Sequence, residues 1–111
     1  MKEKAYKLAV TIFPAYQLLK KKREYDMASQ LWRSTTSISA NIEEAIAGCS
    51  RADFCHRLII ALKEARETRY WLRLLTDIAL LEHTDLQLQE IEEIVKILTR
   101  TVKTINQNES K

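Results

Sequence analysis

Hydrophobic residues recur at every third or fourth position along most of the chain, and this spacing predicts amphipathic helices. Four helices are expected, over about residues 3–22, 27–47, 51–81 and 85–105. The segments between them are only a few residues long, which favours antiparallel neighbours. The pattern therefore predicts an all-α fold, an antiparallel up-down-up-down four-helix bundle that occupies residues 1–111 as a single domain.

Several residues mark where the expected helices begin and end. Asp26 is a candidate N-cap for the second helix, and Ser50 and Thr84 open capping boxes before the third and fourth. Gly48 stands where a residue in the left-handed conformation would end the second helix. Pro14 lies inside the first helix, where its missing amide donor predicts a kink or a short first segment.

The third helix carries more hydrophobic residues than one buried face requires. One stripe, from Phe54 to Ala79, has a mean spacing of about 3.5 residues, the period of a bundle seam. A second hydrophobic stripe lies beside it. Because a helix in a monomeric bundle buries one stripe, the second predicts contact with another copy of the chain. The candidate interface residues are Ile59, Leu62, Tyr70, Trp71, Leu74 and Ile78.

The composition supports the helical prediction and excludes other classes of protein. The 111 residues include one glycine and one proline, too few for the hairpins of a β-sandwich or for a glycine-rich phosphate loop. Hydrophobic residues make up 46% and charged residues 30%, which is far from the composition of a disordered chain.

The cysteine, histidine and hydropathy patterns are those expected of a cytoplasmic protein without a metal or cofactor. Cys49 and Cys55 are too few for a disulfide framework, so we expect both thiols to be free. His56 and His83 lie far apart and do not have metal-site spacing. There is no signal peptide, and no run of about 18 apolar residues that would cross a membrane.

The net charge of +3 is small, but the basic residues are clustered. In the third helix, Tyr70 and Trp71 are interleaved with a row of arginines, and such a row can follow a phosphate backbone and stack bases. It can equally be a solvated face, and the basic cluster ending the first helix can complement the helix dipole. The candidate nucleic-acid contacts are Lys20, Lys21, Lys22, Arg23, Arg66, Arg69, Arg73, Lys96, Arg100 and Lys103.

The second helix is rich in Ser and Thr and carries a polar stripe on a segment that otherwise looks buried. Buried polar groups need partners, so the stripe predicts a network between helices that Glu64 or Glu67 can join. A ligand or partner site is the alternative interpretation. Glu64 and Glu67 do not have the Glu-x-x-His spacing of bundle metal sites, which favours salt bridges for them.

Three segments of the chain resemble the bacterial four helix bundle protein family. They are RSTTSISANIEEA (residues 33–45), SRADF (residues 50–54) and IALKEARET (residues 60–68). That family includes proteins encoded in intervening sequences of bacterial large-subunit ribosomal RNA genes. This chain has Glu43 where the family pattern has Ala, and Ala45 where it has Gly.

The resemblance implies a four-helix bundle that assembles as a homo-oligomer, commonly a barrel-like pentamer. A related accessory protein of diversity-generating retroelements binds a reverse transcriptase and nucleic acid through a basic surface. The family supplies no catalytic residue. The resemblance, together with the polar stripe, singles out as motif positions and network candidates Arg33, Ser37, Asn41, Glu44, Ser50, Phe54, Glu64 and Glu67.

These observations favour a non-enzymatic homo-oligomer that binds RNA, DNA or an RNA-associated protein through its basic surfaces. One alternative is a module for protein–protein assembly alone, or the accessory subunit of a retroelement reverse transcriptase. Another is an enzyme or metal protein built on the bundle.

Overall fold

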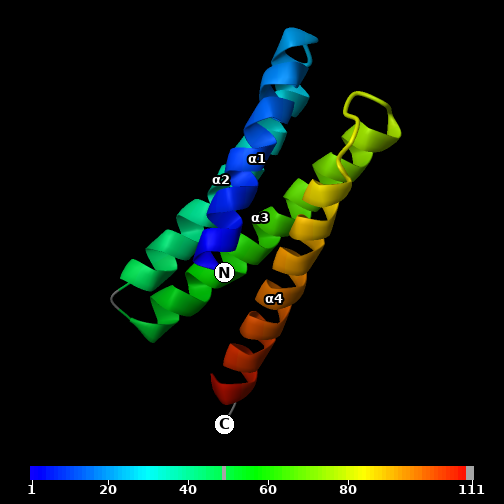
Figure 1. Ribbon diagram of the computed structural model, residues 1–111. Helices are drawn as coiled ribbons and strands as arrows, with labels where there is room; N and C mark the ends of the chain where they lie inside the picture. The colour runs from blue at the N-terminus through cyan, green and yellow to red at the C-terminus, as the bar shows by residue number, and fades with distance from the viewer. Residues whose placement is uncertain (49, 110–111) are drawn as a thin grey trace.

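The computed structural model describes residues 1–48 and 50–109, which form four helices joined by short turns (Figure 1). The helices are α1 (Lys2–Lys21), α2 (Tyr25–Ala47), α3 (Arg51–Asp77) and α4 (Asp85–Glu109). Successive helices run antiparallel. The α1–α2 and α3–α4 loops therefore lie at one end of the molecule, and the α2–α3 connection lies at the other. The predicted all-α up-down-up-down fold is confirmed.

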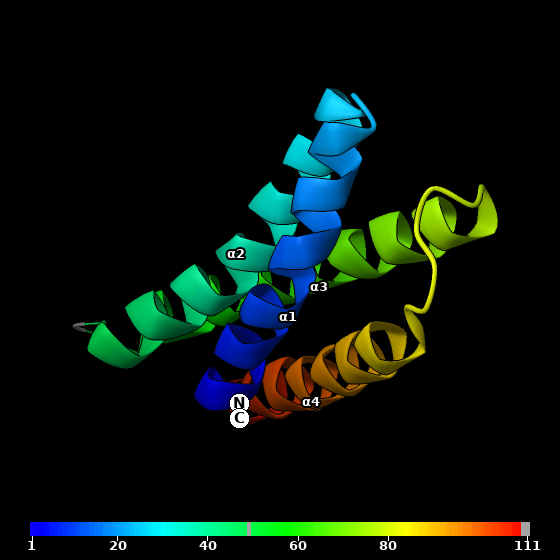
Figure 2. The same cartoon turned by 45° about the horizontal axis from the view of Figure 1, so that its top comes forward.

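The helices form two hairpins, and the α1–α2 hairpin packs as a layer on the α3–α4 hairpin. The molecule is elongated, with extents of 50 × 22 × 21 Å. Contact between the layers is most extensive along α2 and α3, whereas α1 meets α4 over a shorter stretch. Figure 2 shows the two hairpins crossing and separating toward their loops. The α2–α3 pair therefore forms the centre of the bundle.

The core follows the helical period that the sequence predicts. On α1 the fully buried side chains include Leu8 and Ile12, one turn apart, and on α4 they include Ile91 and Ile94. Burial of one such side chain contributes about 1.5–3 kcal/mol to the free energy of folding. The hydrophobic clusters of all four helices join into one continuous core.

The helix bounds differ from the sequence predictions at several ends. The α2 helix begins two residues earlier than expected, at Tyr25, and α4 continues beyond Ile105 to Glu109. The α1 helix is continuous through Pro14, so the prediction of a short first segment is wrong. The α3 helix ends at Asp77, four residues before the predicted Leu81.

The early end of α3 is caused by a Schellman motif whose left-handed residue is not glycine. The Ala79 amide donates to the Thr76 carbonyl at 3.0 Å, and the Leu80 amide donates to the Leu75 carbonyl at 2.9 Å. Ala79 has a φ of 63°. Arg23, with a φ of 64°, occupies the same position after α1. The motif at α3 turns the chain back, and Leu81, which follows the motif, is buried in the core.

Gly48 does not have the left-handed conformation that the sequence suggested. Its φ and ψ are −62° and 152°, which is extended backbone. A Cβ atom at this position would lie 2.5 Å from Oδ2 of Asp53, in the first turn of α3. The predicted cap of α3 is confirmed, because the Asp53 amide donates to the Ser50 hydroxyl at 3.1 Å. The glycine therefore leaves room for the carboxylate at the start of α3.

Side chains join the two loops at one end of the bundle. The Lys22 ammonium donates to the Leu80 carbonyl at 2.8 Å, so the α1–α2 turn is held to the α3–α4 turn. The hydroxyl groups of Thr76 and Thr84 lie 2.8 Å apart and link the last turn of α3 to the start of α4. Thr84, which directly precedes α4, is therefore also bonded to α3.

Within residues 1–48 and 50–109, no helix is long and apolar enough to cross a membrane. Cys55 is buried and its thiol is free, whereas Cys49 lies outside the described residues.

We predict that Ala79→Gly raises the free energy of unfolding by about 0.5–1 kcal/mol, because glycine adopts a positive φ without steric cost. Urea denaturation followed by circular dichroism measures the change. Ala52→Gly is the matched control, since Ala52 is exposed in the first turn of α3 and glycine is the less favourable helix residue, so this substitution should lower the free energy of unfolding. A loss of stability in Ala79→Gly would contradict the prediction.

Candidate nucleic-acid interface

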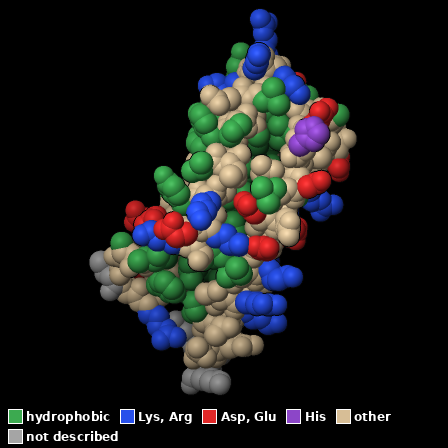
Figure 3. All heavy atoms as spheres, viewed as in Figure 1, with side chains coloured by type: hydrophobic (Ala, Val, Ile, Leu, Met, Phe, Trp, Pro, Cys, Tyr) green, Lys and Arg blue, Asp and Glu red, His purple; other side chains and the backbone are tan. Residues whose placement is uncertain are grey.

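Basic residues of α3 and α4 line one shallow groove on the outside of the α3–α4 hairpin. The groove has a volume of about 330 Å³, and its walls include Arg69 from α3 and Lys96 and Arg100 from α4. Lys103 follows on the same face of α4, one turn further along. In the space-filling view, basic side chains gather over the carboxyl-terminal half of α4 (Figure 3). The packing of α3 on α4 thus brings together cations that are far apart in the sequence.

The α3 side of this surface is a row of arginines one turn apart. Arg69 forms an ion pair with Glu92 at 3.5 Å. Arg66 and Arg73 lie one turn before and after Arg69 and are both exposed. Within the described part of the chain, neither forms an ion pair with a carboxylate. Both guanidinium groups are therefore available to an anionic ligand.

The remaining candidate cations, at positions 20–23, lie elsewhere on the molecule. They end α1, whereas Lys103 belongs to the last turns of the antiparallel α4, so the two groups lie at opposite ends of the bundle. Lys20 stacks over the Tyr16 ring at 5.0 Å, and Lys22 bonds to the α3–α4 loop. The structure does not place these residues with the α3–α4 groove.

The interface predicted on α3 is only partly exposed. Leu62 is 8% exposed and belongs to the chain's own core, so its assignment to an oligomer interface is wrong. The neighbouring helices cover that side of α3, which the sequence pattern alone does not reveal. Trp71 and Leu74 are half-buried. The exposed members of the predicted set are Ile59, Tyr70 and Ile78.

A large apolar groove lies on the other layer, between α1 and α2, and sequence reasoning missed it. Its volume is about 580 Å³. Tyr6 and Val10 of its α1 wall are 60% and 58% exposed, and Phe13 is also exposed. These residues are spaced at i, i+4 and i+7, which is a readable signal for a second apolar stripe on this helix. Small residues of α2, including Ser39 and Ala40, line the rest of the groove.

Several hydroxyl groups of the Ser- and Thr-rich α2 donate to carbonyl oxygens of the same helix. Thr35 and Thr36 donate to the carbonyl oxygens of Leu31 and Trp32 at 2.7 and 2.8 Å. These bonds allow weak helix formers to be buried without unpaired polar groups. Ser and Thr side chains can therefore be buried in α2, the helix that packs against α3 at the centre of the bundle.

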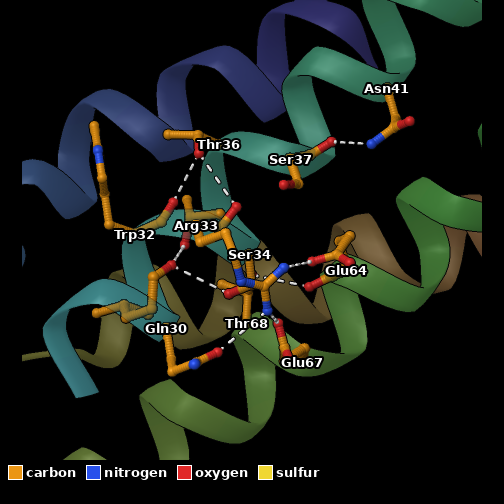
Figure 4. Close-up of polar contacts among 12 residues, drawn as sticks. Gln30, Trp32, Arg33, Ser34, Thr36, Ser37, Asn41, Glu64, Glu67 and Thr68 are labelled. Carbon is orange, nitrogen blue, oxygen red and sulfur yellow. Dashed lines mark hydrogen bonds and ion pairs between the residues drawn. The ribbon is translucent and has the colours of Figure 1, made fainter. Parts of the chain in front are cut away.

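Two polar contacts tie α2 to α3, and Figure 4 shows them side by side. In the core, the Thr68 hydroxyl donates to Ser34 Oγ at 2.9 Å, and both side chains are fully buried. At the rim, Arg33 Nη1 lies 3.2 Å from Glu64 Oε2, and Arg33 Nη2 also pairs with Glu67. Arg33 therefore occupies the space between the two carboxylates.

The other members of the predicted polar set make separate contacts. Asn41 donates to the Ser37 carbonyl at 2.8 Å and accepts from Arg57 Nη1 at 3.5 Å. Glu44 is exposed eleven residues beyond Arg33, and the Ser50 side chain caps α3. The structure thus brings Arg33 together with both α3 glutamates but does not join the whole stripe into one network.

The carboxylates are not gathered into a metal-binding cluster in the part of the chain that the structure describes. No group of three or more His, Cys, Asp or Glu side chains lies close enough there to hold a metal ion. The Glu64 and Glu67 carboxylates instead share ion pairs with the Arg33 guanidinium.

Comparison with family models decides the relationship that the sequence motifs suggested. The model described as 23S rRNA-intervening sequence protein matches residues 1–100, which include α1, α2, α3 and most of α4. The chain belongs to this family. None of the curated proteins compared shows significant similarity to it.

A solved structure is similar to this family member over nearly its whole length. It is a Bacteroides thetaiotaomicron protein of the S23 ribosomal protein family, crystallised as a protein of unknown function. The two are 42% identical and superimpose with a TM-score of 0.85, over 92% of this chain and 97% of the other. The two comparisons thus agree on the family and the fold.

We predict that Arg33 and Glu64 are energetically coupled across the α2–α3 contact by about 1 kcal/mol, because Glu64 is only 16% exposed and accepts a charge-assisted hydrogen bond. A double-mutant cycle with Arg33→Met and Glu64→Gln, read by urea denaturation, measures the coupling.

The Lys2–Glu43 pair is the matched control, because its side chains are 51% and 50% exposed and exposed pairs contribute little. We expect a coupling near zero there. Equal coupling in both pairs would show that partial burial does not strengthen the Arg33–Glu64 contact.

Proposed function

We propose that this protein is a non-catalytic homo-oligomer that binds RNA through the outer face of the α3–α4 hairpin. The observation that carries the proposal is the meeting of Arg69, Lys96 and Arg100 at one groove, with further exposed cations on either side. The description of the family as 23S rRNA-intervening sequence proteins supports RNA as the polymer.

The dimensions of the cationic surface suit a phosphate backbone. Lys96 and Lys103 are seven residues apart, so they span about 10 Å along α4 at a rise of about 1.5 Å per residue. The three cations of this row, Lys96, Arg100 and Lys103, can each contact one phosphate of a nucleic-acid backbone. The arginines of α3 form a second row beside it, which widens the contact.

We predict that replacing Lys96, Arg100 and Lys103 with Gln weakens RNA binding and reduces its dependence on salt. Each cation that no longer neutralises a phosphate makes the slope of log K against log salt shallower by about 0.7–0.9. The slope of the triple variant should therefore be shallower by about 2–3. Fluorescence anisotropy of a labelled RNA at several salt concentrations measures both the affinity and the slope.

A variant with Lys2, Lys4 and Lys7 replaced by Gln is the control, since it removes the same charge from α1. It should keep most of the affinity and slope. If both variants lose affinity equally, binding depends on net charge alone and the α3–α4 surface is not the site.

The proposal includes self-association through the α1–α2 groove. An apolar face with Tyr6 and Val10 more than half exposed is costly to leave in water. The family resemblance implies five copies in a closed ring.

We predict that Val10→Asp lowers the mass of the assembly, because it places a charge in the apolar groove. Light scattering after size exclusion should give the wild type about five times the chain mass of 13.0 kDa. Leu86→Asp is the control, as this exposed residue lies at the start of α4 and should leave the mass unchanged. A wild-type protein that elutes as a single chain at micromolar concentration would refute self-association.

A module for protein–protein assembly alone is the second candidate function, and the α1–α2 groove is the observation that favours it. This groove is larger and more apolar than the α3–α4 groove and does not require RNA. The partner would be a second copy or an RNA-associated protein. An assembly of the expected mass that shows no salt-dependent binding of RNA would support this candidate over the first.

A further inference from the structure

The outer face of α3 carries an exposed aromatic ring between two arginines. We propose that this ring, of Tyr70, stacks on an unpaired base, so that the protein binds single-stranded RNA in preference to duplex RNA. The inference rests on the proposed RNA function and adds the form of RNA that is bound.

The Tyr70 ring is open to solvent and held in place from one side. Its side chain belongs to the exposed face of α3, and the residue is 56% exposed. The ring meets that of Trp71 in an edge-on contact, with centroids 5.2 Å apart and planes inclined by 76°. Trp71 is half-buried and packs against the hydrophobic core. An edge-on contact with a fixed indole limits the movement of the phenol ring and leaves a flat face free for stacking.

The two arginines stand one turn away from the ring on either side. Arg66 is four residues before Tyr70 and Arg73 is three residues after it, so all three share one face of the helix. The two arginines are about 10 Å apart along the axis. Because neither is held by a carboxylate in the described part of the chain, both can contact phosphates that flank a stacked base.

A shallow depression beside the ring can receive the edge of the base. Its volume is about 240 Å³, and it is lined by Tyr70, Arg73, Leu74 and Asp77. The Asp77 carboxylate accepts hydrogen bonds, and the exocyclic amino group of adenine can donate one. The Leu74 side chain supplies an apolar surface for the base. An oligoadenylate is therefore the probe that suits the depression.

Stacking separates single-stranded from duplex RNA, whereas the basic rows contact both. In a duplex the bases are paired and stacked on one another, and an aromatic side chain cannot reach their faces. An unpaired base has a free face, and its stacking on an aromatic ring increases affinity by about tenfold or more. The effect of Tyr70 on affinity should therefore appear with single strands alone.

Fluorescence anisotropy with a labelled 12-nucleotide oligoadenylate and a 12-base-pair RNA duplex tests the inference. We expect the wild type to bind the single strand more tightly. Tyr70→Leu, which keeps an apolar side chain but removes the ring, should weaken single-strand binding about tenfold and leave duplex binding unchanged. Tyr70→Phe should retain most of the single-strand affinity.

Tyr25→Leu is the matched control, because Tyr25 is 59% exposed at the start of α2 and should affect neither probe. The inference is overturned if Tyr70→Leu binds the single strand as tightly as the wild type, or loses affinity equally for both probes. If the wild type binds neither RNA, the proposed function itself fails. If it binds both in a salt-dependent way regardless of the Tyr70 ring, that function stands and only the stacking platform is refuted.

Discussion

The close contact between α2 and α3 is the constraint on which the rest of the bundle depends. Small side chains occupy it, and Ser34 and Thr68 are fully buried there and hydrogen-bonded to each other. A shift of one helix along the other would break this bond between the helices, and a typical hydrogen bond contributes about 0.5–1.5 kcal/mol to stability. Arg33 precedes Ser34 in the chain, so the same register sets its guanidinium between the α3 carboxylates. The α1 and α4 helices then pack on the outside of this central pair.

Most of the fold could be predicted from the sequence, because a period near 3.6 residues identifies a helix and short connections make neighbours antiparallel. The Ser50 cap was predictable because it is a local bond between neighbouring residues. The early end of α3 was not, since Ala79 adopts a conformation for which alanine gives no signal. Gly48 was correctly placed at a helix end, but its role depends on the approach of Asp53 and not on its own φ.

For the candidate site, the sequence predicted which residues share a face of one helix. It did not predict which residues of different helices meet. Helical spacing showed that Arg66, Arg69 and Arg73 share a face, but their meeting with Lys96 depends on how α3 packs on α4. The same limit explains the error at Leu62, since a residue at the edge of a stripe is buried or exposed according to its neighbours. Packing also places the apolar groove on the α1–α2 layer and the groove lined by Arg69, Lys96 and Arg100 on the α3–α4 layer. The self-association proposed for the α1–α2 groove would therefore leave the α3–α4 groove open to solvent.

Three residues in the described part of the chain have a positive φ, and two of them, Arg23 and Ala79, follow the ends of α1 and α3 and therefore lie at the same pole of the molecule. Each holds a conformation that costs a residue with a side chain about 1–2 kcal/mol, which lowers the local stability of these two turns. Local opening then begins where the hairpins already diverge, and amide hydrogens in the two turns exchange with solvent sooner than those at the middle of α2. The hydrogen bond from Lys22 to the Leu80 carbonyl joins the two turns at this pole, so it opposes their local opening.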